Sequence, residues 1–106
     1  MKRKLFIALL ATFFAVCLAG AAMAHTPLFS CWDNGDETIS CEGGFSDGSS
    51  AAGTSIIVKD DSGKEIFSGK LDKYGELTFD KPNGAYTVTF DGGPGHSITI
   101  KGEDIQ

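Results

Sequence analysis

The sequence predicts a small all-β domain: an immunoglobulin-like or transthyretin-like β-sandwich of about seven strands with one disulfide. Three observations lead to this prediction. No stretch of ten or more positions after residue 24 carries apolar residues at helical spacing. Short runs of β-branched and aromatic residues recur instead, separated by Gly, Asp, Asn and Pro. Two cysteines also flank an Asn-Gly turn.

Residues 1–24 have the three parts of an export signal. A positive start at Lys2, Arg3 and Lys4 is followed by an almost unbroken apolar run over residues 5–20. Ala22-Met23-Ala24 then supplies the small-x-small pattern that a signal peptidase requires. An uncleaved membrane anchor is the alternative, because about 20 apolar residues can span a bilayer. The polar, turn-rich sequence that follows favours cleavage after Ala24.

Cleavage would leave residues 25–106 as a single domain that is periplasmic or secreted. Val16 precedes Cys17 where a lipoprotein signal has a small residue, so we expect no lipid anchor. Cys31 and Cys41 would remain as an even pair in an oxidising compartment, which predicts a disulfide between them. A metal–thiolate pair is the alternative, but the nine-residue spacer is not a chelate spacing.

The charge of residues 25–106 restricts their partners. The signal holds three of the nine Lys and Arg residues, so six basic side chains remain against 14 acidic ones, a formal net charge of −8. Such a domain repels phosphate groups, which excludes nucleic acid and disfavours anionic membranes. Metal cations or a basic partner are the ligands that this charge favours. We expect a monomer or weak oligomer.

The predicted strands follow one another along residues 25–106. Leu28–Asp33 and Thr38–Phe45 flank Asn34-Gly35, a strong hairpin signal that places both cysteines on paired arms. Further strands are predicted at 54–59, 64–71, 76–79, 86–90 and 98–100, with Gly-containing turns between them. Residues 102–106 are expected to fray.

Part of this pattern resembles a known family. Ser62-Gly63-Lys64, then a strand, an Asp72-x-x-Gly75 turn and a strand ending at Phe79, is similar to the central hairpins of carboxypeptidase-regulatory-like domains. Phe45-Ser46-Asp47-Gly48-Ser49 and Gly95-His96 further resemble the extracytoplasmic accessory component of energy-coupling-factor nickel/cobalt transporters. The resemblance covers about residues 43–101. It implies a β-sandwich that works with the membrane components of a nickel/cobalt transporter.

The two histidines of the sequence are the candidate metal ligands. Cleavage after Ala24 would make His25 the first residue, so that its free α-amine and its imidazole could chelate one ion. His96 lies in a Gly-rich loop and could supply a third nitrogen, a set that suits Cu²⁺ or Ni²⁺, with imidazole also suiting cobalt. Asp91 or Asp47 could complete the shell. The alternative is two exposed histidines with weak adventitious affinity.

We expect no enzymatic activity. The sequence has no His-Glu-x-x-His or Gly-x-Ser-x-Gly motif, and the predicted disulfide leaves no free cysteine nucleophile in residues 25–106. Phe29 and Trp32 could form an exposed aromatic patch for a partner, with core packing beside the disulfide as the alternative.

Two functional hypotheses follow from these residues. The first is a periplasmic metal-handling or accessory protein of nickel/cobalt uptake that binds a divalent ion (Ni, Co or Cu) through His25 and His96. The second is an envelope interaction module that has no metal ligand of its own and docks another protein through a sheet edge or the Phe29/Trp32 surface.

Overall fold

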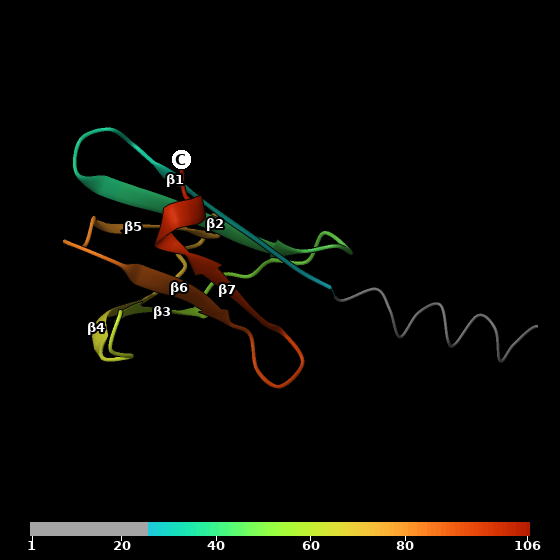
Figure 1. Ribbon diagram of the computed structural model, residues 1–106. Helices are drawn as coiled ribbons and strands as arrows, with labels where there is room; N and C mark the ends of the chain where they lie inside the picture. Colours follow the sequence, from blue (N-terminus) through green and yellow to red (C-terminus); the bar gives the residue numbers. More distant parts are fainter. Residues whose placement is uncertain (1–25) are drawn as a thin grey trace, which may run out of the picture.

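The computed structural model describes residues 26–106, which form seven strands and one short 3₁₀ helix (Figure 1). The predicted export signal and His25 lie outside the described residues. The all-β prediction is confirmed, and each predicted strand is present within one or two residues of its expected bounds. The elements are β1 Pro27–Asp33, β2 Thr38–Phe45, β3 Ser55–Asp60, β4 Glu65–Lys70, β5 Glu76–Asp80, β6 Tyr86–Asp91, β7 Ser97–Lys101 and η1 Gly102–Asp104.

The strands pair into two antiparallel sheets that face each other as two layers (Figure 1). Sheet A has the order β1-β2-β5, and sheet B has the order β4-β3-β6-β7. The first, second and fifth strands share one sheet while the third, sixth and seventh share the other, which is the arrangement of an immunoglobulin-like sandwich. The fourth strand pairs with the third and so belongs to sheet B.

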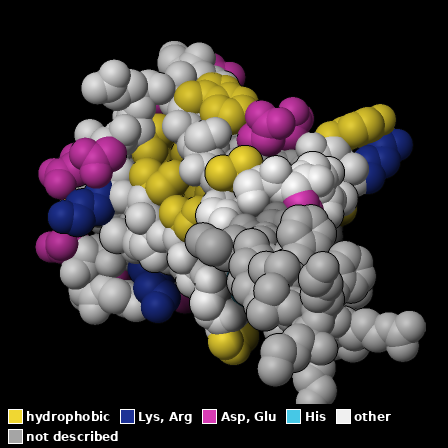
Figure 2. Space-filling view, turned by 90° about the vertical axis from the view of Figure 1, so that its right-hand side faces the viewer, with side chains coloured by type: hydrophobic (Ala, Val, Ile, Leu, Met, Phe, Trp, Pro, Cys, Tyr) yellow, Lys and Arg dark blue, Asp and Glu magenta, His cyan; other side chains and the backbone are white. Residues whose placement is uncertain are grey.

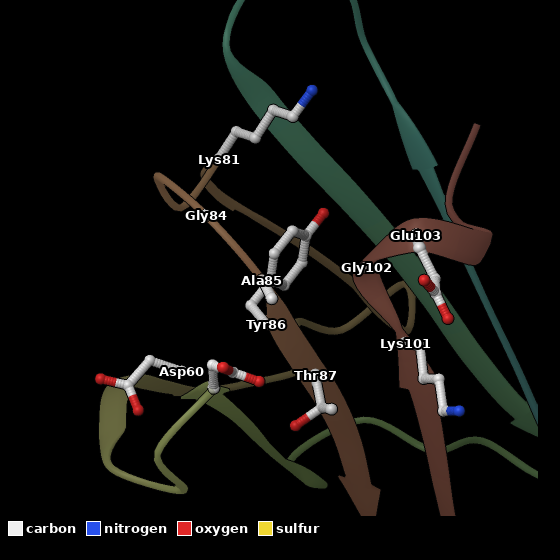
Figure 3. Close-up of a pocket in the computed structure, with 10 residues that line it drawn as sticks. Asp60, Lys81, Gly84, Ala85, Tyr86, Thr87, Lys101, Gly102 and Glu103 are labelled. Atoms are coloured by element: carbon white, nitrogen blue, oxygen red, sulfur yellow. The ribbon is translucent and has the colours of Figure 1, made fainter.

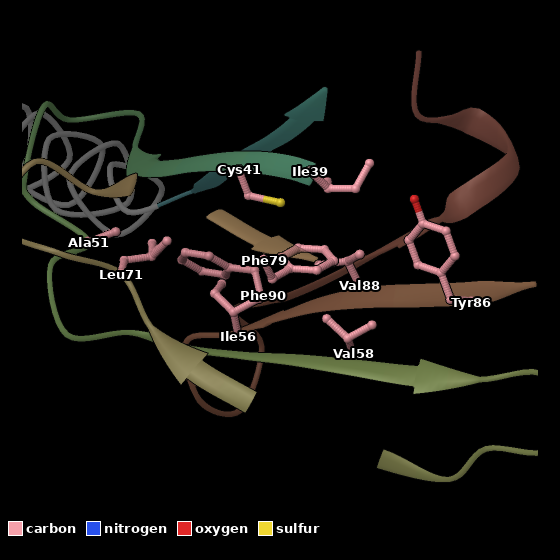
Figure 4. Packing of buried hydrophobic residues seen from close by; sticks show 10 residues of the cluster. All are labelled: Ile39, Cys41, Ala51, Ile56, Val58, Leu71, Phe79, Tyr86, Val88 and Phe90. Atoms are coloured by element: carbon pink, nitrogen blue, oxygen red, sulfur yellow. The ribbon is translucent and has the colours of Figure 1, made fainter. Parts of the chain in front are cut away.

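The core fills the space between the two sheets because alternate residues of each strand point inward. Phe90 of β6 lies at its centre and is fully buried (Figure 4). Its ring reaches across to sheet A, where it packs against Phe29 at 5.4 Å and Phe45 at 6.0 Å between centroids. The buried apolar residues are Ile39, Cys41, Ala51, Ile56, Val58, Leu71, Phe79, Tyr86, Val88 and Phe90.

The predicted disulfide joins the two arms of the first hairpin. Cys31 of β1 lies directly opposite Cys41 of β2 in the strand register, with their Cα atoms 4.0 Å apart and the sulfur atoms bonded. Cys41 is completely buried and Cys31 packs against the core. The bridge therefore closes the inner side of the hairpin and is compatible with a location outside the reducing cytoplasm.

The C-terminal residues do not fray, contrary to expectation. Ile105 packs against the core, and Asp33 donates its backbone N–H to the carbonyl of Gln106 at 3.1 Å. Gly102 lies flat against Tyr86, since a Cβ at this position would come within 2.4 Å of the tyrosine ring. The tail thus satisfies a backbone donor of β1, and η1 closes one end of the core.

No helix in the part of the chain that the structure describes is long and apolar enough to cross a membrane.

An ion pair joins the end of β1 to the turn after β5. Lys81 donates a 2.8 Å hydrogen bond to Asp33 Oδ2, and the N–H of Gly35 donates to Oδ1 at 2.8 Å. These two donors hold the pKa of the Asp33 carboxyl below its ordinary value. In the turn after β3, the hydroxyl of Ser62 and the backbone N–H groups of Lys64 and Ser62 donate to Asp60 and hold its pKa below the ordinary value as well.

Acid should therefore remove part of the stability of the fold. A carboxyl whose pKa is lowered by folding stabilises the protein above its unfolded pKa of about 4, and this contribution disappears as the pH falls through the folded value. We expect urea midpoints measured from about pH 6 to pH 2 to fall less steeply in Asp33→Asn and in Lys81→Met than in the native protein. An unchanged pH dependence in both variants would contradict this role.

Candidate functional site

One end of the sandwich gathers several loops and the start of the described chain. Ser46 donates its N–H to the carbonyl of Thr26 at 2.8 Å, and Thr26 donates its N–H to Ser46 Oγ at 3.2 Å. The β6–β7 loop lies beside the loop that follows β2, because Phe45 contacts His96. We call this region, made up of Thr26, residues 45–49 and the β6–β7 loop, the His96 end. Figure 2 shows the molecule from the right-hand side of Figure 1, where apolar side chains lie at the surface beside acidic ones.

The β6–β7 loop fixes His96 by its own backbone hydrogen bonds. Gly92 donates to the carbonyl of His96 at 3.0 Å, and His96 donates to the carbonyl of Gly93 at 2.9 Å. Gly93 has a φ of 98°, a conformation that glycine adopts readily and other residues rarely do. The loop is therefore a defined turn, and the histidine ring is held at its base.

The orientation of the imidazole follows from its contact with Pro94. His96 Nδ1 lies 3.1 Å from the Pro94 carbonyl oxygen. A carbonyl only accepts, so Nδ1 carries the proton of the neutral ring and Nε2 carries the lone pair. Histidines that ligate metals are commonly held in this way, with the other ring nitrogen donating to a backbone carbonyl.

A small pocket adjoins the imidazole. It has a volume of about 220 Å³ and is lined by Phe45, Ser49, Gly92 and His96. The Phe45 ring meets the histidine edge-on, with centroids 6.4 Å apart. The pocket therefore offers an imidazole at one wall and an apolar ring at another.

The two predicted carboxylate ligands are used to stabilise loops. Asp47 Oδ1 accepts hydrogen bonds from the N–H and hydroxyl of Ser49, at 2.9 and 2.6 Å. Asp91 Oδ1 accepts from the N–H of Gly93 at 3.3 Å. Residues 26–106 contain no group of three or more His, Cys, Asp and Glu side chains placed to hold a metal ion. The structure thus does not bring Asp47, Asp91 and His96 together as a ligand set.

Phe29 and Trp32 lie on opposite faces of sheet A. Phe29 points inward and packs against Phe90, whereas Trp32 points outward and keeps 38% of its surface exposed. The two rings therefore form no common patch. The alternation of β1 predicts this difference. Phe29 is two residues from Cys31 and therefore points to the same side of the sheet as the disulfide, whereas Trp32 is adjacent to Cys31 and points to the other side.

A larger pocket lies at the opposite end, beside Tyr86 (Figure 3). Its volume is about 560 Å³, and burial raises the pKa of the Tyr86 hydroxyl. The charged side chains around it are Asp60, Asp61, Lys81, Lys101 and Glu103. Both signs are present, and in Figure 3 the labelled charged groups spread apart around the opening rather than converge on one point. This pocket therefore favours no single class of ligand.

Comparison with known proteins gave no match. No family model, no curated protein and no solved structure resembles this chain closely enough to be reported.

Proposed function

We propose that the domain binds a divalent transition-metal ion at the His96 end, through His25 and His96, and handles that ion outside the cytoplasm. The observation that supports this proposal is the attachment of Thr26 to Ser46. Ser46 follows Phe45, whose ring contacts His96. Thr26, the residue that follows His25 in the sequence, therefore lies at the same end of the sandwich as His96.

The ligand chemistry of the proposed site is three nitrogens. A free α-amine and the imidazole of His25 form a chelate, and His96 contributes Nε2, the atom whose lone pair the Pro94 contact leaves available. Such a set favours Cu²⁺ and Ni²⁺ by the usual order of affinities, and Co²⁺ less strongly. The net charge of −8 on residues 25–106 raises the local concentration of any cation.

The biological setting of the proposal comes from the resemblance of residues 43–101. An accessory component of a nickel/cobalt uptake system works in the periplasm beside membrane components of the transporter. An exported, acidic domain with a nitrogen-rich site suits the capture of such an ion before transport.

Titration calorimetry of the protein beginning at His25, with Ni²⁺, Co²⁺ and Cu²⁺ in turn, tests the proposal. His25→Ala removes the imidazole arm of the chelate, and His96→Ala removes the third nitrogen. We expect each change to weaken one-to-one binding by about tenfold or more. Ser68→Ala, at an exposed position of β4, is the control and should leave binding unchanged. Weak binding with the same affinity in the native protein and in both variants would contradict the metal proposal.

Substitution of Gly92 tests whether metal binding depends on the position of the His96 imidazole as well as on its presence. A Cβ at Gly92 would lie 2.7 Å from the carbonyl oxygen of His96, 2.9 Å from the ring of Phe90 and 3.2 Å from the Cβ of His96. Gly92→Ala therefore keeps the imidazole but shifts the loop that carries it. Gly44→Ala is the matched control, because no atom lies within 4 Å of its added Cβ. We expect only Gly92→Ala to weaken metal binding. Equal affinities for the two alanine variants would show that the position of His96 is unimportant.

A further inference from the structure

The outer face of sheet A is exposed on its two edge strands, β1 and β5, and at Glu42 of β2 between them. Strand alternation directs Leu28, Ser30 and Trp32 of β1 outward, and the same rule applies to the other two strands. The outward residues of β2 and β5 are Thr38, Ser40, Glu42, Gly44, Glu76, Thr78 and Asp80. All three outward residues of β1 and all three of β5 are exposed, so no other part of residues 26–106 covers them.

This face carries an uncompensated row of carboxylates. Glu42 lies directly opposite Glu76 in the register of β2 and β5, and Asp80 is outward on the same strand as Glu76. Like charges directly opposite each other destabilise a sheet, so the pairing does not serve folding. No lysine of the described chain occupies an outward position of sheet A. The lysines lie in sheet B or in turns, at positions 59, 64, 70, 73, 81 and 101.

Two exposed apolar side chains lie on β1, beside the carboxylates of β2 and β5. Ser30 is opposite Glu42 in the register, and Leu28 and Trp32 lie two residues to either side of it on β1. Leu28 is 54% exposed and Trp32 is 38% exposed. The face thus combines exposed apolar side chains on the β1 edge with carboxylates on β2 and β5.

Hydrogen bonds between side chains hold this face rigid beside Trp32. Asn34 Nδ2 donates to Thr38 Oγ1 at 3.0 Å and to Ser40 Oγ at 2.8 Å. Ser40 Oγ is also bonded to Thr78 Oγ1 at 2.8 Å, which ties β2 to β5. These four side chains therefore lose little conformational freedom when a partner binds, which favours affinity.

We propose that the outer face of sheet A docks a positively charged protein segment. Lys or Arg side chains of the segment lie between Glu42 and Glu76, and its apolar or cationic groups pack on Trp32 and Leu28. Charge complementarity selects this partner. A second copy of residues 25–106, with a net charge of −8, is repelled, and a neutral glycan carries no positive charge to compensate the three carboxylates. The inference stands independently of the metal site.

Trp32 gives the test a local signal, because it is the only tryptophan of the sequence. The probe is a synthetic peptide of alternating Arg and Val, titrated into the protein while tryptophan fluorescence is recorded. Peptides of alternating Glu and Val and of alternating Ser and Val are the controls. We expect a saturable change with the arginine peptide alone. Equal binding of the serine peptide would overturn the proposal.

Matched variants distinguish this face from the general attraction of an acidic protein. Glu42→Gln/Glu76→Gln should weaken arginine-peptide binding by about tenfold or more. Glu65→Gln/Glu103→Gln removes the same charge elsewhere and should change binding by less than about twofold. Equal weakening in both pairs would overturn the proposal. Self-association that the first pair alone abolishes in sedimentation experiments would also overturn it, by identifying a second copy as the occupant.

Discussion

Phe90→Ala is expected to lower the free energy of unfolding by about 3–5 kcal/mol. The side chain is fully buried and joins the two layers, since its ring contacts Phe29 and Phe45 of sheet A from a strand of sheet B. Its removal leaves a cavity that two paired sheets cannot close. Because small domains are stable by about 5–15 kcal/mol, the variant should be close to unfolding at room temperature in urea titrations followed by circular dichroism.

Tyr74→Ala is the control for this aromatic truncation. Tyr74 is 71% exposed, and its main contact is the ammonium of Lys73 above the ring at 5.0 Å. Its loss should change the unfolding free energy by no more than about 0.5 kcal/mol. Comparable effects of the two substitutions would mean that Phe90 does not join the sheets as described.

Loss of the disulfide should have the second-largest effect, about 2–3 kcal/mol. Cys31 and Cys41 are ten positions apart, so the bond removes the freedom of a short loop from the unfolded chain. Reduction of the native protein under non-denaturing conditions should lower its urea midpoint and leave the strand signal in place. Cys31→Ala/Cys41→Ala should show a similar loss whether or not reductant is present.

The same double variant provides the check. A further shift when reductant is added to it would mean that reduction acts on something other than this bond. An unchanged midpoint of the native protein after complete reduction would mean that the bridge contributes nothing to stability.

Much of the fold was predictable because the turns between the strands contain residue types that are typical of turns. Asn34-Gly35 and Asp72-x-x-Gly75 mark turns, and the intervening runs alternate in polarity as half-buried strands do. The disulfide followed from two cysteines on the arms of one hairpin. These signals lie within a few neighbouring residues, so they can be recognised without knowing which strands pair.

The rest depended on contacts that no local pattern shows. Ile105 is a single apolar residue after a polar turn, and its burial depends on the packing of η1 against β6. The Glu42–Glu76 pair joins strands that are distant in sequence, so only the register brings the two carboxylates together. Phe29 and Trp32 were separable in principle, because the cysteine between them sets which side of β1 is buried. The chelate at His25 stays a prediction.

The strand order of sheet A has a consequence for the time course of folding. β1 and β2 are adjacent in sequence and are covalently joined, whereas β5 reaches the sheet only after β3 and β4 have passed to the other layer. Local pairings form before distant ones because the loop they close is short. The hairpin is therefore expected to form early, and the pairing of β5 with β2 is expected to follow it. Oxidation early in folding would then form the native disulfide, because Cys31 and Cys41 already face each other in the β1–β2 hairpin. The bond would in turn hold the two strands in their native pairing.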